Sequence, residues 1–230
     1  MIGRTCFTIL LLSGLFAFSQ PVMAEEAGVT QAKVIDNMAE QAEALIDALL
    51  KKHQASAEQH YDALKADLDQ LHTLIAKKDF NERRTRELFT AYSWMRLTAI
   101  DMHSKAWTGA AIAANQMSGE IIRFTDFSDL TMRDVAWMNY LGMDVMLLSM
   151  EDMQGNQQTI DLRRDELRET WKRVREDLIK DFRNKTLVMR GDQIVGNMHE
   201  ADNSKEVISL ARDELAFVDD IEKTLGAAKP

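Results

Sequence analysis

Proline is almost absent from this chain, and that absence constrains the fold more than any other feature. The only prolines in the 230-residue sequence are Pro21 and Pro230. A proline inside a helix removes a backbone hydrogen bond and clashes with the preceding turn, so residues 22–229 contain no helix breaker of that kind. Hydrophobic residues make up 46% of the chain and charged residues 28%, which is the balance of a folded globular protein. The sequence therefore predicts an all-α protein.

The first 24 residues have the pattern of a cleavable secretory signal peptide. Arg4 supplies the positive start, residues 7–18 form an apolar core, and residues 22–24 read Val-Met-Ala before Glu25. The apolar run is shorter than the ~20 residues that span a bilayer. We expect cleavage after Ala24, which leaves residues 25–230 as a single helical-bundle domain. Because Cys6 is the only cysteine, we expect a mature chain without cysteine, exported to a bacterial periplasm.

The charge balance excludes one class of partner. The chain has 28 Lys and Arg against 37 Asp and Glu, a net charge of −9 at pH 7. An acidic protein without a large basic patch is a poor candidate for nucleic-acid binding. After residue 24 no segment is a continuous apolar span, so we expect no membrane span after cleavage. The expected partner is a protein or a small ligand in the periplasm, and a homodimer is plausible because elongated hairpins often pair side by side.

The spacing of apolar residues predicts a long antiparallel hairpin of two helices. Apolar residues recur every three or four positions from about residue 30 to 77, which predicts one amphipathic helix. Its length would be ~70 Å at 1.5 Å per residue. Asp79 and Glu82 have capping-box spacing and open a second helix that extends to about Phe124.

Further helices follow this hairpin. A third helix is predicted from Thr131 to a stop at Gly155, and a fourth over residues 157–188; the alternative is that the two form one long bent helix. Residues 190–202, with two glycines, are predicted to be a loop, and Asn203 with Glu206 caps a last helix. Four-apart pairs such as Glu169 with Arg173 indicate a solvated face on the fourth helix. The predicted fold is an elongated up-and-down bundle of four to five helices.

The short motifs of most enzyme classes are missing. The sequence contains no G-x-G-x-x-G, Walker loop, G-x-S-x-G or H-E-x-x-H. Without a cysteine, the mature chain can have neither a thiol nucleophile nor a C-x-x-C-H haem attachment. General acid–base sites need no short motif, so the pattern leans against an enzyme without excluding one. We expect a non-enzymatic protein that acts by binding, as an adaptor, a scaffold or a ligand-presenting module.

A polar gap in the first predicted helix suggests an alternative function. Histidines occupy core-facing positions there, and a fold-back near residue 79 or 80 would place a third histidine opposite them. The next hairpin would bring two methionines to the same level. Imidazole and thioether groups are ligands of copper, zinc and haem iron. The alternative is a metal or haem carrier, with the site His53, His60, His103, Met150 and Met153; the simpler interpretation is that each histidine is a partly exposed, hydrogen-bonded side chain.

Small residues gather between Ala106 and Ser118 and are flanked by Trp107 and Trp137. Such a cluster either lets another helix approach closely or leaves room for a flat ligand. Close packing is the simpler interpretation of the two.

Overall fold

The computed structural model describes residues 30–76, 81–180 and 184–227, and within these ranges every element is a helix. The predicted all-α class is confirmed. The predicted signal peptide lies outside the described residues. The described part has eight helices rather than four or five: α1 (Gln31–Leu50), α2 (Gln54–Ala76), α3 (Glu82–Ser104), α4 (Trp107–Phe124), α5 (Leu130–Asp152), α6 (Gln157–Lys180), α7 (Lys185–Glu200) and α8 (Ser204–Ala227).

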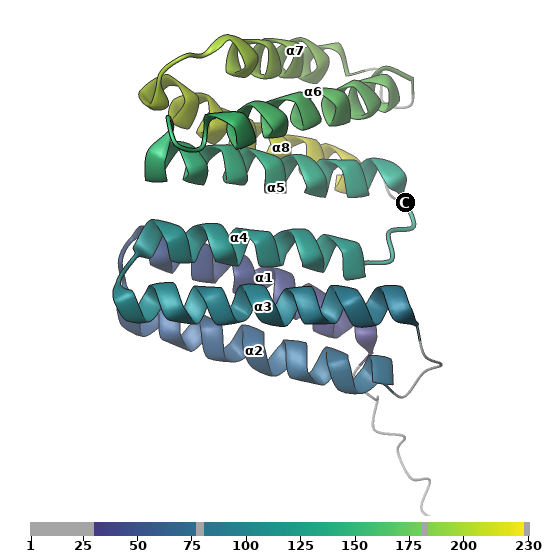
Figure 1. Ribbon diagram of the computed structural model, residues 1–230. Coiled ribbons are helices and arrows are strands. Elements are labelled where there is room, and N and C mark those ends of the chain that lie inside the picture. Colours follow the sequence, from purple (N-terminus) through teal and green to yellow (C-terminus); the bar gives the residue numbers. More distant parts are fainter. Residues whose placement is uncertain (1–29, 77–80, 181–183, 228–230) are drawn as a thin grey trace, which may run out of the picture.

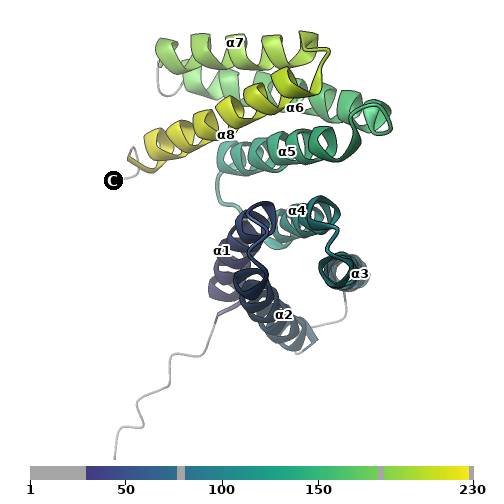
Figure 2. The same ribbon diagram turned by 90° about the vertical axis from the view of Figure 1, so that its left-hand side faces the viewer.

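The helices form two four-helix groups that lie one against the other (Figure 1). In the first group α1 packs against α2 and α4, and α3 packs against α2 and α4. In the second group α5 and α7 each pack against α6 and α8. Figure 2 shows α3 and α4 of the first group nearly end-on, whereas the helices of the second group run across the view. Among the described residues, α4 and α5 are the only pair of helices that packs across from one group to the other.

The two long helices predicted for residues 30–124 do not form, because each segment folds back on itself. Between α1 and α2 the backbone of Lys52 is left-handed, with φ 55°. The N–H of His53 donates to the carbonyl of Ala48 at 2.9 Å, which closes the end of α1. Between α3 and α4, Lys105 has φ 59°, and the N–H of Ala106 donates to Asp101 at 2.9 Å. Both turns have the Schellman pattern that usually has glycine at the left-handed position.

The predicted helix signals nearer the C-terminus are mostly confirmed. The break at Gly155 separates α5 from α6. Asn203 accepts a hydrogen bond from the backbone N–H of Glu206 at 3.0 Å and donates one to its carboxylate at 2.9 Å. The cap of α5 is Asp129 rather than Thr131, whose N–H donates to the Asp129 carboxylate at 2.8 Å.

The loop predicted over residues 190–202 is instead most of α7, and the predicted fourth helix ends earlier, at Lys180. Asn184 caps the start of α7 by accepting from the N–H of Leu187 at 3.2 Å. Gly191 does not break this helix. A Cβ at Gly191 would lie 2.3 Å from the Trp171 ring and 2.8 Å from the Phe217 ring. The glycine therefore allows α7 to pack closely on α6 and α8.

The two central helices are the most enclosed. Of the described helices, α4 and α5 alone each pack against three others. The side chains of Phe124 on α4 and Met138 and Leu141 on α5 are fully buried. The contact between α4 and α5 brings the two helix groups together. None of the described helices is long and apolar enough to cross a membrane.

Candidate binding site between the two helix groups

A pocket of about 300 Å³ lies where α4, α5 and α6 meet. Both helix groups contribute to its lining, because α4 belongs to the first group and α5 and α6 belong to the second. Three of its six lining residues are arginines, in a chain whose net charge is −9. The lining residues are Ile122 and Arg123 of α4, Arg133, Asp134 and Trp137 of α5, and Arg173 of α6.

Arg173 is held by its surroundings and forms a fixed wall. Its Nε donates to the carboxylate of Asp134 at 2.6 Å, and this bond raises the pKa of Arg173. Its Nη1 donates to the carbonyl of Glu169 at 3.2 Å, and its Nη2 donates to the hydroxyl of Thr170 at 3.3 Å. Each guanidinium nitrogen thus has a partner, and these bonds use three of the five N–H groups of Arg173. Arg173 therefore positions Asp134 and keeps only two N–H groups free.

Arg123 and Arg133 use fewer of their guanidinium N–H groups in hydrogen bonds than Arg173 does. Arg123 Nη1 donates to Glu120, and its guanidinium lies over the Trp137 ring at 5.5 Å from the centroid. Arg133 Nη2 donates to Asp134 at 3.2 Å. The remaining nitrogens of both side chains have no hydrogen-bond partner among the described residues. Since about half of each side chain is exposed, these donors are available to a ligand in the pocket.

Trp137 is fixed from behind by a polar network. Its indole Nε1 donates to Glu166 at 2.9 Å, and its ring packs on Tyr140 with 4.7 Å between centroids. Arg163 of α6 then donates to Glu166 at 3.1 Å and to the Tyr140 hydroxyl at 3.2 Å. The tryptophan wall of the pocket is therefore held in one orientation.

The same network continues to a buried acid, Asp144, which is 1% exposed. Arg163 Nε donates to it at 2.8 Å, and Gln116 of α4 donates to it at 2.8 Å. Tyr140 donates to the Gln116 side chain at 2.9 Å. Burial raises the pKa of Asp144, and the hydrogen bonds from Arg163 and Gln116 oppose that effect. The network links α4, α5 and α6 and includes Trp137, which lines the pocket.

The chemistry of the pocket follows from its donors. Guanidinium groups recognise carboxylates and phosphates through charge-assisted hydrogen bonds. Ile122 and Trp137 add apolar walls beside these donors. The arrangement therefore suits an anionic ligand that has some apolar surface.

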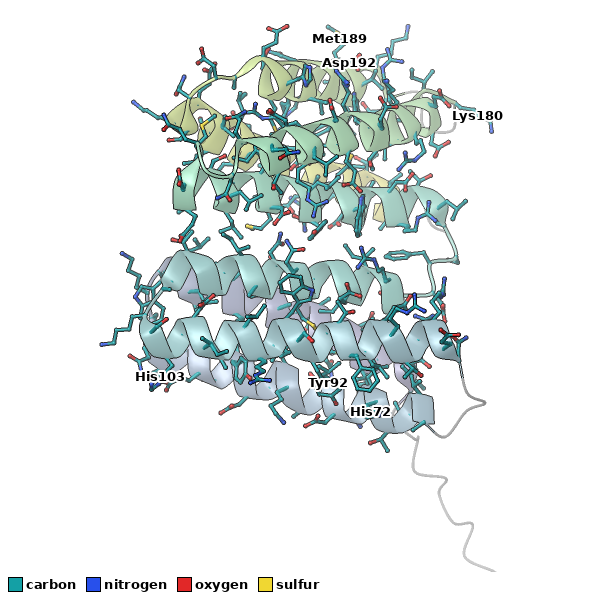
Figure 3. The ribbon with its side chains drawn as sticks, viewed as in Figure 1. His72, Tyr92, His103, Lys180, Met189 and Asp192 are labelled. Atoms are coloured by element: carbon teal, nitrogen blue, oxygen red, sulfur yellow. The ribbon has the colours of Figure 1, made fainter. Side chains whose placement is uncertain are left out.

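The three predicted metal-ligating histidines do not meet. His53 is exposed in the turn between α1 and α2, and His103 is exposed at the end of α3 (Figure 3). His60 lies on α2, with its Nδ1 2.8 Å from Gln41 Oε1 on α1. The predicted register is wrong, because the chain first folds back at residues 51–53, so that α2 rather than α3 lies along α1. No three His, Cys, Asp or Glu side chains in the described ranges are placed to hold a metal ion.

The two predicted methionine ligands lie in the other helix group. Met150 is near the end of α5 and 39% exposed, and Met153 directly follows this helix. All three histidines belong to the first group. Metal binding by these residues stays a prediction, without the convergent geometry on which it was based.

A fourth histidine, His72, has a structural environment. It lies beside Tyr92 between α2 and α3 (Figure 3), with 5.9 Å between ring centroids. The Tyr92 hydroxyl donates to Asp69 at 2.7 Å, and burial together with this bond raises the tyrosine pKa. A tyrosine of raised pKa keeps its proton and acts as a hydrogen-bond donor rather than a nucleophile. The contacts of Tyr92 with Asp69 and His72 therefore link α3 to α2.

Comparison with protein-family models, curated proteins and solved structures finds no match to this chain. The pocket residues must therefore be interpreted from their own chemistry. In the sequence the charged lining residues are separate positions on three helices and form no binding motif. Only Trp137 indicates a ligand site, as a neighbour of the small residues of α4.

Proposed function

We propose that the protein is an exported, non-enzymatic binding protein of the periplasm, and that the pocket between α4, α5 and α6 binds a small anionic ligand. One observation carries this proposal. Arg123 and Arg133 present unpaired guanidinium nitrogens to a pocket of about 300 Å³. Guanidinium donors in a concave site are a common means of anion capture.

The rigidity of the surroundings supports binding further. Arg173, Asp134 and Trp137 are each fixed by hydrogen bonds. A site whose walls are already ordered loses less conformational entropy when a ligand enters. The position between two helix groups also lets a ligand contact both of them.

Export and a non-enzymatic role rest on the sequence. Residues 1–24 have the signal-peptide pattern, and no short catalytic motif is present. A binding protein that presents its ligand to a partner is consistent with both features.

The test is a titration of the isotope-labelled mature protein, followed by NMR at the indole N–H of Trp137. The probes are sulfate, inorganic phosphate and benzoate. We expect a saturable shift with at least one probe, and an affinity for that probe about ten-fold weaker in the variant Arg133→Gln. The matched control is Arg86→Gln, which removes an exposed arginine paired with Glu82 on α3. A saturable shift with none of the three probes, or one whose affinity is unchanged in Arg133→Gln, would overturn the proposal.

A further inference from the structure

We infer that the ligand of this pocket is an amphipathic organic acid, with a single carboxylate on an apolar body. This inference rests on the proposed function and names the ligand class. It follows from three properties of the site: which donors are free, how much charge remains, and where the apolar surface continues.

The free donors come from two helices. Arg123 is on α4 and Arg133 is on α5, and each uses one guanidinium nitrogen for an acid on its own helix. A carboxylate between them would accept from both side chains. Arg173 uses three of its five N–H groups for Asp134, Glu169 and Thr170, so Arg123 and Arg133, which use one each, offer the most free donors.

The remaining charge matches one negative group. Three arginines line the pocket, and two carboxylates pair with them: Asp134 with Arg133 and Arg173, and Glu120 with Arg123. Three positive and two negative charges leave one positive charge. A monoanion neutralises this charge, whereas a phosphate dianion would leave an excess negative charge next to Asp134 and Glu120.

The apolar surface continues beyond the pocket. Ile122 and Trp137 line it directly. Leu130 lies one turn before Arg133 and Asp134, and helical spacing places it on the same side of α5 as these residues and Trp137. Its side chain is 65% exposed. An apolar body attached to the carboxylate would cover these side chains, and an inorganic ion would leave them in water.

The experiment measures the binding of three probes by calorimetry: naphthalene-2-carboxylate, the neutral naphthalene-2-methanol and inorganic phosphate. We expect the carboxylate to bind about ten-fold or more tightly than either of the other two. Arg123→Gln and Arg133→Gln should each weaken the carboxylate by about ten-fold and leave the neutral probe unchanged. Leu130→Ser should weaken the carboxylate several-fold and leave phosphate unchanged.

Controls keep the result interpretable. Arg86→Gln should bind all three probes as the parent does. The side chains of Arg123 and Arg133 are about half exposed and that of Leu130 is 65% exposed, so these variants should keep the parent's circular dichroism spectrum.

The contrary outcomes separate the two proposals. If phosphate binds as tightly as the carboxylate and depends on Arg133, the ligand class is wrong and the anion site stands. If the carboxylate and the neutral probe bind equally, the ligand class is wrong. If no probe binds, or the carboxylate binds independently of both arginines, the site itself is refuted.

Discussion

Glu214 should make the protein less stable as the pH rises from acidic to neutral. This glutamate of α8 is fully buried, and neither of its carboxyl oxygens has a hydrogen-bond partner among the described residues. It packs onto Gly142 of α5 so closely that a Cβ there would lie 1.8 Å from its Oε2. Burial raises the pKa of Glu214 well above its ordinary value.

The sign and the limit of the effect follow from proton linkage. Below pH ~4.3, the pKa of an unfolded glutamate, the carboxyl is protonated in both the folded and the unfolded chain, so its ionisation costs no stability. Above that pH the unfolded chain releases its proton while the folded chain keeps it. Stability then falls by up to about 1.36 kcal/mol per pH unit, until the folded carboxyl also ionises. At pH 7 the loss is therefore at most about 3.7 kcal/mol, a large part of a typical total of about 5–15 kcal/mol.

Two variants separate charge from hydrogen bonding. Glu214→Gln keeps the shape and cannot ionise, so its advantage over the parent should be near zero around pH 4 and grow toward the limit at pH 7. Glu214→Met also removes the unpaired polar atoms. Its free energy of unfolding should exceed that of Glu214→Gln by about 1–3 kcal/mol at every pH. The free energy of unfolding is measured with urea at several pH values between 4 and 7.5. Asp213→Asn, at the exposed neighbouring carboxylate, is the matched control.

The pH dependence decides the outcome. Because every other carboxylate titrates equally in parent and Glu214→Gln, the difference between the two isolates Glu214. A difference in the free energy of unfolding that stays constant from pH 4 to 7 would refute the conclusion that the Glu214 carboxyl is buried and unpaired. A parent that is more stable than Glu214→Gln at pH 7 would refute it as well.

Three other predictions concern the turns, the helix packing and the N-terminus. Lys105→Gly should raise the free energy of unfolding by about 1 kcal/mol, because the left-handed backbone there suits glycine; a loss of stability in urea would contradict the turn. Gly191→Ala should lower the melting temperature, at a cost of about 1–3 kcal/mol from overpacking. Gly196→Ala, on the same helix with nothing within 4 Å of its new Cβ, should raise it; the opposite order would refute the packing. N-terminal sequencing of protein released by gentle opening of the outer membrane should begin at Glu25, and finding Met1 on membrane-embedded protein would exclude cleavage.

The helical class was predictable, but the fold-back points were not. The 3.6-residue period and the lack of internal proline are properties of the chain itself. The turn at residues 51–53 keeps that period, because α1 and α2 both present an apolar face to one core, and Leu49 and Ala57 are both fully buried across it. Lys52 and Lys105 occupy left-handed positions without the glycine that signals them. The periodicity therefore predicts which residues are helical and buried, but it does not predict where the chain reverses direction.

The α7 helix was missed for a different reason. The sequence pattern predicts a loop at Gly191, whereas this glycine supplies space for the rings of Trp171 and Phe217 from neighbouring helices. The same residue type serves a turn or a close approach, and only the tertiary partner distinguishes the two. The cap at Asn203 was predictable because its partner, Glu206, lies three residues away.

The candidate site shows why local rules assign charged side chains poorly. The sequence pairs Arg173 with Glu169 on one helix, but the Arg173 guanidinium bonds Asp134 of α5 at 2.6 Å and only the backbone carbonyl of Glu169. An exposed four-apart pair stabilises a helix by about 0.3–0.5 kcal/mol. Asp134 is 6% exposed, and an uncompensated buried charge costs about 3–5 kcal/mol. The more buried carboxylate, that of Asp134, therefore determines the orientation of Arg173, and this orientation fixes one wall of the pocket.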